Sequence, residues 1–214
     1  MIRALIVDDH PVVQKGLVEI LTENFDNIRI EGIRTGRQFM ESIKQHDYDI
    51  VFLDISLPDS NGLDILRDIR KRRPNLPILV ISVYPEELYA IRAIKTGARG
   101  YLTKQCEPEE LVAAVNAVMS GKKYINPRFA GKMITNFESC AEKPAHEKLS
   151  NMEFQVMRMF GSGKSIKDIA RELNLSINSI RAYRLHIMEK IGVKGMEGLI
   201  VYALRHGITE YKNG

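Results

Sequence analysis

Five polar side chains of this protein stand where apolar runs of the sequence end: Asp8, Asp9, Asp54, Ser82 and Lys104. Such runs, rich in β-branched residues, are typical of strands that are buried on both faces of a sheet. The carboxyl ends of parallel strands meet at one edge of the sheet, where open α/β folds bind their ligands. We therefore expect three carboxylates, a hydroxyl and an ammonium group to converge at one edge.

This set of groups predicts a phosphoryl-transfer site. Three like charges are unfavourable together unless a cation neutralises them, and carboxylate oxygens are typical ligands of Mg²⁺. Asp54 would attack a donor phosphorus, Lys104 and the metal would neutralise the phosphoryl oxygens, and Ser82 would hydrogen-bond one of them. For any single residue, a helix cap or a surface position is the simpler interpretation. Their joint placement at strand ends favours the site.

Strand-like and helical runs alternate along the first 121 residues and would position these groups. Strands are predicted over 4–7, 28–33, 50–53, 78–82 and 100–103. Helices are predicted over 11–24, from 35 onward, and over 63–72, 85–96 and 108–120. Alternation of this kind implies right-handed crossovers and a parallel sheet covered by helices on both faces.

The length of 214 residues allows one large or two small domains. Residues 148–214 hold eleven Lys and Arg against six Asp and Glu, whereas the first 147 residues are nearly neutral. Any nucleic-acid contact is therefore expected in the basic tail. Residues 122–147 contain Pro127, Gly131 and Pro144 among polar stretches, which predicts a linker with one short helix over 127–137.

Membrane and secreted classes of protein fit the sequence poorly. No run approaches the roughly eighteen apolar residues of a membrane span. The start of the chain leads into a strand rather than a signal peptide, and the two cysteines match no metal-binding spacing. We therefore expect a reduced, cytoplasmic protein without a membrane partner.

Four short helices are predicted in the tail, which is the layout of a helix-turn-helix module. They are expected from 150 onward, over 166–173, from 176 onward and over 196–206. Gly161-Ser162-Gly163-Lys164-Ser165 looks like part of a phosphate loop, but position 158 is Arg and helical spacing precedes it. We therefore predict no ATP site there, and no metabolic enzyme.

One face of the third tail helix carries residues that can enter a major groove. At about 100° per residue, its core stripe contains Ile180, Ile187 and Ile191. The opposite face holds Asn178, Arg181, Ala182, Leu185 and Glu189. Arg side chains pair with guanine and Asn side chains with adenine. An ordinary solvated face is the alternative, because Glu189 would repel phosphates.

The first 121 residues resemble the receiver domain of bacterial response regulators. The matching pieces are Val7-Asp8-Asp9-His10, Phe52-Leu53-Asp54-Ile55-Ser56-Leu57-Pro58, Asn61-Gly62, Val80-Ile81-Ser82, Gly97-Ala98 and Gly100-Tyr101-Leu102-Thr103-Lys104. The resemblance implies a flavodoxin-like (βα)5 fold with a parallel sheet in the order 2-1-3-4-5. Ser82 stands where threonine is more common in the family.

The same resemblance implies roles for individual residues. Asp54 would accept a phosphoryl group from a sensor histidine kinase. Mg²⁺ would lie on the carboxylates and the residue 56 carbonyl, with Asp8 supporting; the implied metal site is Asp8, Asp9, Asp54 and Ser56. Ser82 would move toward the phosphoryl group while Tyr101 rotates inward, which would change the face formed by the fourth helix, the fifth strand and the fifth helix.

Residues 148–207 resemble the LuxR-type output domain of the NarL/FixJ response regulators. The matches are Leu149-Ser150, Glu153, Gly163, Ile169-Ala170, Leu173, Leu175-Ser176, Ser179-Ile180, Lys190-Ile191-Gly192-Val193 and Ala203. By this likeness, the residues that face bases are Arg181, Ala182 and Leu185. The implied phosphate contacts are Ser165, Lys167, Ser176, Ser179 and Lys190. Asn178 stands where Lys is usual, and we include it among the DNA-binding residues.

Together these features predict a phosphorylation-controlled transcription factor with a receiver domain over 1–121, a linker over 122–147 and a small all-α helix-turn-helix domain over 148–214. Phosphorylation would switch homodimerisation and binding to double-stranded DNA, and RNA polymerase is a further candidate partner. One alternative is a transcription factor that dimerises independently of phosphorylation. Another is a tail that docks on a protein instead of DNA.

Overall fold

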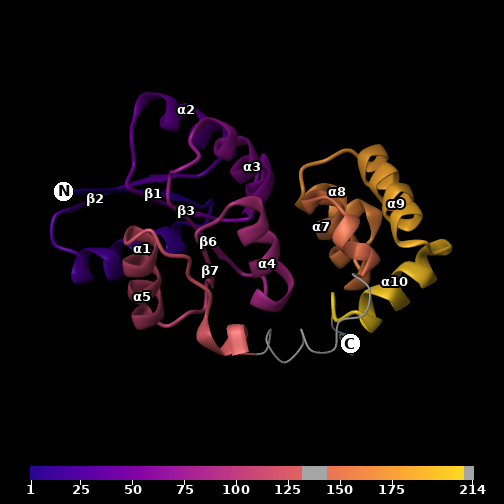
Figure 1. Cartoon of the computed structure of the whole chain (residues 1–214). Helices are drawn as coiled ribbons and strands as arrows, with labels where there is room; N and C mark the ends of the chain where they lie inside the picture. Colours follow the sequence, from indigo (N-terminus) through magenta and orange to yellow (C-terminus); the bar gives the residue numbers. More distant parts are fainter. Residues whose placement is uncertain (132–143, 210–214) are drawn as a thin grey trace. The chain divides into compact units, whose positions relative to one another are not determined.

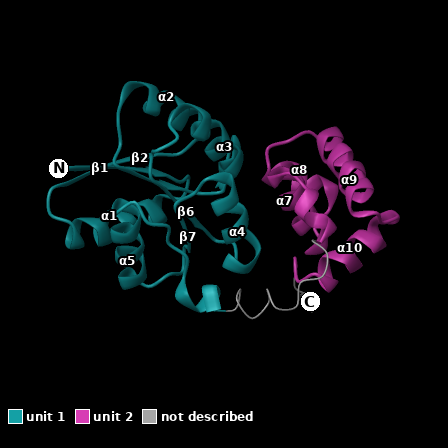
Figure 2. Ribbon diagram, in the orientation of Figure 1, with its two compact units in different colours: residues 1–138 teal, residues 139–214 magenta. Residues whose placement is uncertain are grey.

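The computed structural model describes residues 1–131 and 144–209, which fold into two compact units (Figure 1). The first unit comprises residues 1–138 and the second residues 139–214 (Figure 2). The boundary between the two units lies outside the described residues.

A five-stranded parallel sheet forms the centre of the first unit, in the order β2-β1-β3-β6-β7. Its strands are β1 (Ile2–Val7), β2 (Ile28–Ile33), β3 (Ile50–Leu53), β6 (Ile78–Ser82) and β7 (Gly100–Thr103). Two short strands, β4 (Ser56–Leu57) and β5 (Ser60–Asn61), pair in a separate antiparallel hairpin. When only the five strands of this sheet are numbered along the chain, β6 is the fourth and β7 the fifth. The order is then 2-1-3-4-5 as predicted, and the flavodoxin-like fold is confirmed.

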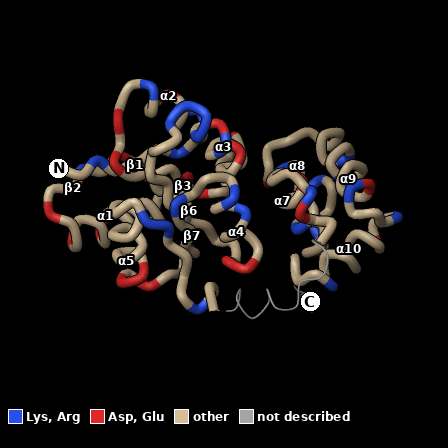
Figure 3. Tube along the Cα trace, in the orientation of Figure 1, with Lys and Arg blue, Asp and Glu red and all other residues tan. Residues whose placement is uncertain are grey.

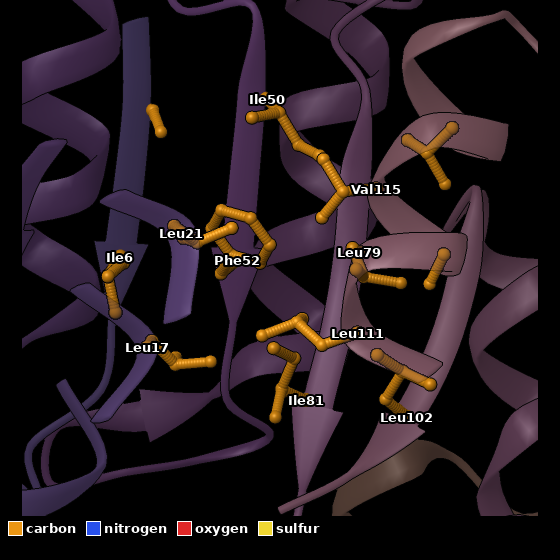
Figure 4. Close-up of a cluster of buried hydrophobic side chains, with 13 residues drawn as sticks. Ile6, Leu17, Leu21, Ile50, Phe52, Leu79, Ile81, Leu102, Leu111 and Val115 are labelled. Atoms are coloured by element: carbon orange, nitrogen blue, oxygen red, sulfur yellow. The ribbon is translucent and has the colours of Figure 1, made fainter. Parts of the chain in front are cut away.

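Helices cover both faces of this sheet: α1 (Pro11–Asn24), α2 (Gly36–Gln45), α3 (Gly62–Arg72), α4 (Glu86–Thr96) and α5 (Pro108–Met119). Leu17 of α1 and Leu111 of α5 pack on one face, in a cluster that includes Phe52 and Leu79 (Figure 4). Burying one such side chain contributes about 1.5–3 kcal/mol to stability. The apolar runs of the sequence thus form this core, and the polar residues that follow them lie at the carboxyl edge of the sheet.

The loop after β3 holds Asp54 in place through a close backbone contact. A Cβ atom at Gly62 would lie 2.0 Å from the carbonyl oxygen of Asp54, so only glycine lets the start of α3 approach the end of β3 this closely. The Asn61 side chain accepts the N–H of Leu63 at 2.9 Å and caps α3. The Asn-Gly pair therefore anchors the chain next to the expected site.

The first unit continues past residue 121, where the linker was predicted to begin. The Tyr124 N–H donates to the Arg99 carbonyl at 2.8 Å, and Tyr124 forms a parallel bridge with Gly100 of β7. Phe129 is buried, and residues 127–131 are helical. The remainder of the helix predicted over 127–137 lies outside the described residues.

The second unit is helical throughout its described elements. They are a 3-10 turn, η1 (Ala145–Lys148), and the helices α7 (Asn151–Gly161), α8 (Ile166–Glu172), α9 (Ile177–Ile191) and α10 (Gly195–Arg205). The capping box predicted for α7 is present, because the Ser150 side chain accepts the Glu153 N–H and the Glu153 side chain accepts the Ser150 N–H. Ser165 and Ser176 cap α8 and α9.

A short turn joins α8 to α9, as a helix-turn-helix module requires. Asn174 in this turn has a positive φ of 51°. The stripe predicted for α9 is confirmed, since Ile180, Ile187 and Ile191 are buried. Each of the helices α7 to α10 carries at least one Lys or Arg (Figure 3). Among the residues that the structure describes, no helix has both the length and the apolar character of a membrane span.

Candidate functional site

Three strand ends bring oppositely charged groups together at the carboxyl edge of the sheet. The Lys104 Nζ atom, after β7, lies 2.7 Å from Asp8 Oδ2 and 2.7 Å from Asp54 Oδ2. These two carboxylates follow β1 and β3, which are neighbours in the sheet. Lys104 therefore forms one charged cluster with two carboxylates that lie fifty or more positions before it in the chain.

Burial gives this cluster unusual electrostatics. Asp8 and Asp54 are each only 2% exposed. Burial raises the pKa of Asp54, and the charge and hydrogen bond of Lys104 offset this only in part. Burial works to lower the pKa of Lys104, but the two carboxylates outweigh it and hold that pKa above its ordinary value. Lys104 therefore stays positively charged, and its charge stabilises the ionised form of Asp54, which burial disfavours.

The acidic residues also fit a second cation. The Asp54 Oδ1 atom is buried and has no hydrogen-bond partner among the described residues. One ligand atom from each of Asp8, Asp9, His10 and Asp54 can be chosen so that all four lie within 4.8 Å of one another. Ser56, whose carbonyl was expected to join them, opens β4 two residues after Asp54. Carboxylate oxygens in such a cluster suit a divalent ion such as Mg²⁺.

His10 belongs to this cluster, although sequence reasoning gave it no role. Its Nδ1 atom lies 3.0 Å from Asp8 Oδ1 and 2.9 Å from Asp9 Oδ1. Its position directly after the acidic pair was the available signal, but the direction of its side chain depends on the turn into α1.

The two residues expected to act as a switch, Ser82 and Tyr101, are both buried and are both hydrogen-bonded to the backbone of Tyr84, whose N–H donates to Ser82 Oγ at 3.4 Å. The Tyr101 hydroxyl donates to the Tyr84 carbonyl at 2.8 Å. The ring therefore already points inward in this structure, which is the position that phosphorylation was expected to produce.

Tyr84 is a further residue that sequence reasoning did not single out. Its hydroxyl accepts a hydrogen bond from the Ser56 Oγ atom at 2.8 Å, and its ring stacks on Tyr89 with centroids 4.6 Å apart. The loops that follow β3 and β6 are thereby connected beside Asp54. Nothing in the local pattern around residue 84 indicates this contact, because its partner lies 28 positions earlier.

The face of α9 expected to contact bases is exposed. Arg181 and Ala182 are exposed, and Leu185 is 59% exposed. An apolar side chain this exposed on a helix can contact a thymine methyl group in the major groove. The Asn178 Oδ1 atom accepts a hydrogen bond from Arg181 at 3.4 Å, so these two polar residues share one patch.

The residues expected to contact phosphates lie in different environments. Ser176 and Ser179 join each other at 2.8 Å at the start of α9, where the helix dipole favours an anion. Lys167 is exposed. Ser165 instead donates to Asp168 Oδ2 at 2.6 Å, and this carboxylate would oppose a phosphate.

Lys190 is held away from a simple phosphate role by an ion pair. Its Nζ atom lies 2.8 Å and 2.7 Å from the two carboxylate oxygens of Glu153. Burial works to raise the pKa of Glu153, but Lys190 and the Ser150 N–H outweigh it and lower that pKa. The ion pair of Lys190 with Glu153 therefore connects the end of α9 to the start of α7.

Two family models match the chain, one in each unit. Residues 4–116 match the response regulator receiver domain, and residues 147–203 match the bacterial regulatory proteins of the luxR family. The chain belongs to the response regulators of this two-domain type. In such a response regulator, the combination of domains implies regulation of transcription under the control of phosphorylation, with a histidine kinase as partner. The family consists of DNA-binding regulators rather than metabolic enzymes.

Relatives match the response regulator along almost its whole length. It is 31% identical to the response regulator UvrY of Escherichia coli over 210 residues, which cover 97% of this chain and 96% of the relative. A solved structure of two RcsB dimers bound to two parallel DNAs is 25% identical with a TM-score of 0.58, covering 94% and 97% of the two chains. RcsB from Salmonella enterica serovar Typhimurium bound to promoter rprA shares the fold with a TM-score of 0.64 at 24% identity, covering 94% and 98%.

Proposed function

We propose that Asp54 of this response regulator accepts a phosphoryl group from a phosphohistidine of its sensor kinase. The observation that carries the proposal is the position of Lys104 Nζ, 2.7 Å from the carboxylates of both Asp8 and Asp54. An Asp54 oxygen attacks phosphorus, the P–N bond of the donor breaks, and a P–O bond forms. Lys104 neutralises charge on the phosphoryl oxygens as they approach the buried edge.

Mg²⁺ would be held by the carboxylates of Asp9 and Asp54 and the carbonyl of Ser56, with Asp8 as a supporting acid. The unpartnered Asp54 Oδ1 atom supports this set, because a buried carboxylate oxygen without a donor is unfavourable unless a cation meets it. When bound, Mg²⁺ supplies positive charge that stabilises the phosphoryl oxygens.

Ser82 would donate a hydrogen bond to a phosphoryl oxygen on Asp54. The backbone of Tyr84 supports a coupled switch, since its N–H donates to Ser82 Oγ and its carbonyl accepts the Tyr101 hydroxyl, so a movement of Ser82 can reach Tyr101 through this residue. Tyr101 lies in β7 beside α4 and α5 in the chain, and a change at this face would alter homodimerisation. In this proposal, the added phosphate charge changes the hydrogen bonds of two buried hydroxyl groups, those of Ser82 and Tyr101.

The second unit would place α9 in a DNA major groove. Arg181, Ala182 and Leu185 would face bases, and the exposed surface around them supports this direction. Phosphate contacts would come from Lys167, Ser176 and Ser179, and Asn178 would lie beside Arg181 on the base-reading face. Ser165 and Lys190 would reach a phosphate only by releasing the carboxylates of Asp168 and Glu153. Two half-sites about one helical turn apart would suit a two-fold dimer. RNA polymerase is a further candidate partner of the DNA-bound dimer in the cytoplasm.

Treatment with an acyl phosphate and Mg²⁺ tests this function directly. We expect the mass measured by light scattering to change from monomer to dimer, and binding to a duplex selected from a random pool to tighten by at least about tenfold, or about 1.4 kcal/mol. If neither the mass nor the affinity changes while Asp54 is phosphorylated, the phosphorylation-independent alternative is correct.

Arg181→Ala separates DNA binding from protein docking by the tail. Loss of a bidentate contact to guanine is expected to weaken binding to the selected duplex by about 1–3 kcal/mol and to relax the preference at one base. Fluorescence anisotropy at several salt concentrations measures both effects. Arg29→Ala removes the same charge from β2 and serves as the control. An equal loss of DNA affinity in both variants would mean that Arg181 contributes only its positive charge and no contact to a particular base.

A further inference from the structure

The turn into α1 directs the imidazole ring of His10 at the acidic cluster. Pro11 is the first residue of the helix, and the residue before a proline is kept in extended backbone. His10 has φ −88° and ψ 108°, and its side chain makes no capping hydrogen bond to the helix. Although this side chain is 57% exposed, its Nδ1 atom lies 3.0 Å from Asp8 Oδ1 and 2.9 Å from Asp9 Oδ1. The ring is thus turned toward the carboxylates.

Lys104 does not satisfy all the oxygens in this cluster. It pairs with the Oδ2 atoms of Asp8 and Asp54, and this leaves the Oδ1 atoms of Asp8, Asp9 and Asp54 without a Lys104 contact. His10 Nδ1 lies within 3.0 Å of the Oδ1 atoms of Asp8 and Asp9, but neither Asp9 Oδ1 nor Asp54 Oδ1 has a hydrogen-bond partner among the described residues. Three carboxylates therefore face one ammonium group, which leaves negative charge that a second cation beside His10 would neutralise.

We propose that His10 is itself a ligand of the divalent cation, and that its imidazole shifts the preference of the site from Mg²⁺ toward first-row transition ions such as Mn²⁺ and Co²⁺. This inference rests on the cation site proposed above and goes further in naming the ligand that selects the metal. Ligands on opposite sides of one ion, with bonds of about 2.1 Å, lie about 4.2 Å apart. The four ligand atoms lie within 4.8 Å of one another, which is close to that separation.

A neutral imidazole can bind a metal ion through either ring nitrogen. Nδ1 is the ring nitrogen of His10 that faces Asp8 and Asp9, so it is the atom that would bind the ion.

The expected selectivity follows from the chemistry of the donor atoms. Mg²⁺ prefers an octahedron of oxygen atoms and keeps several waters. Imidazole nitrogen binds transition ions better, and the affinity for a mixed site rises from Mn²⁺ to Co²⁺. Replacing one water by His10 therefore adds more binding free energy for Mn²⁺ or Co²⁺ than for Mg²⁺.

Binding of Mn²⁺ and of Mg²⁺ to the full chain, measured by calorimetry at pH 8, tests the proposal. His10→Phe is expected to weaken Mn²⁺ binding by about tenfold or more, with a clearly smaller loss for Mg²⁺. Pulsed electron paramagnetic resonance of bound Mn²⁺ should show nitrogen coupling in the natural protein and none in His10→Phe. His10→Gln, which keeps a polar side chain but offers oxygen, should bind Mn²⁺ without that coupling. The control His46→Phe removes an exposed histidine of the same unit and should change nothing.

Two results would overturn the inference. Absence of nitrogen coupling in the natural protein would show that His10 is not a ligand. An equal loss for both metals in His10→Phe would show that the ring only positions Asp8 and Asp9 by hydrogen bonds. Asp9→Asn tests the cation site itself. This variant should bind both Mn²⁺ and Mg²⁺ much more weakly. Unchanged binding would refute the cation site proposed at Asp9 and would leave the role of His10 to the other two variants.

Discussion

Asp54→Asn is expected to reduce phosphoryl uptake to the background level. The amide has nearly the shape of the carboxylate, but it lacks the anionic oxygen that attacks phosphorus. It also leaves Lys104 paired with Asp8 alone, so the electrostatic arrangement at the end of β3 is lost. Intact-protein mass spectrometry after treatment with an acyl phosphate and Mg²⁺ measures the added phosphate, and hydroxylamine lability identifies an acyl phosphate.

A matched variant shows that this loss is specific. Asp26→Asn changes an exposed aspartate of the same unit and should leave phosphorylation unchanged. Full phosphorylation of Asp54→Asn, on Asp8 or Asp9 for example, would contradict the assignment of Asp54. The same variant should also fail to dimerise or to bind DNA more tightly after treatment, because no charge is added for Ser82 to meet.

Lys104→Met is expected to destabilise the first unit by about 3 kcal/mol at pH 7 in metal-free buffer, because removing one partner leaves buried charges uncompensated. Asp8 and Asp54 share this one ammonium group, and the Lys104 side chain is only 6% exposed. Hydrogen exchange of peptides that cover β1 and β3 gives the free energy of opening of these strands. Addition of Mg²⁺ should restore part of the loss.

The pH dependence of this loss has a definite sign. Burial already raises the pKa of Asp54 above its unfolded value, and Lys104 opposes that shift. Without Lys104 the folded-state pKa rises further, so the folded protein binds the proton better than the unfolded chain does. Stability is then greatest at acid pH and falls as pH rises through the folded-state pKa. Lys15→Met, which removes an exposed lysine, should show no such loss; an equal loss at pH 5 and pH 7 in Lys104→Met would contradict the explanation.

Local sequence patterns predicted the bounds of most elements well. The strand over 28–33 and the helix over 11–24 agree with β2 and α1 at both ends. The capping box at Ser150 was also predictable, since it involves residues only three positions apart. These features depend on periodicity, caps and turns within a short window, which any isolated segment already contains.

The expected linker shows where such patterns fail. Composition placed its start at residue 122, yet Tyr124 hydrogen-bonds to Arg99 and bridges Gly100 of the edge strand β7. A polar segment next to a sheet edge can gain backbone hydrogen bonds that its own residues do not encode. The structure therefore adds residues 122–131 to the first unit.

For the candidate sites, the residue types and their places at strand ends were visible in the sequence, because an apolar strand must expel a charge at its end. The partners were not. The pairing of Lys104 with both acids and of Lys190 with Glu153 depends on contacts between segments distant in the chain. The direction of the His10 ring depends on the turn into α1. A side chain's direction and its partner are set by the packing of neighbouring elements, and that packing exists only once the chain has folded.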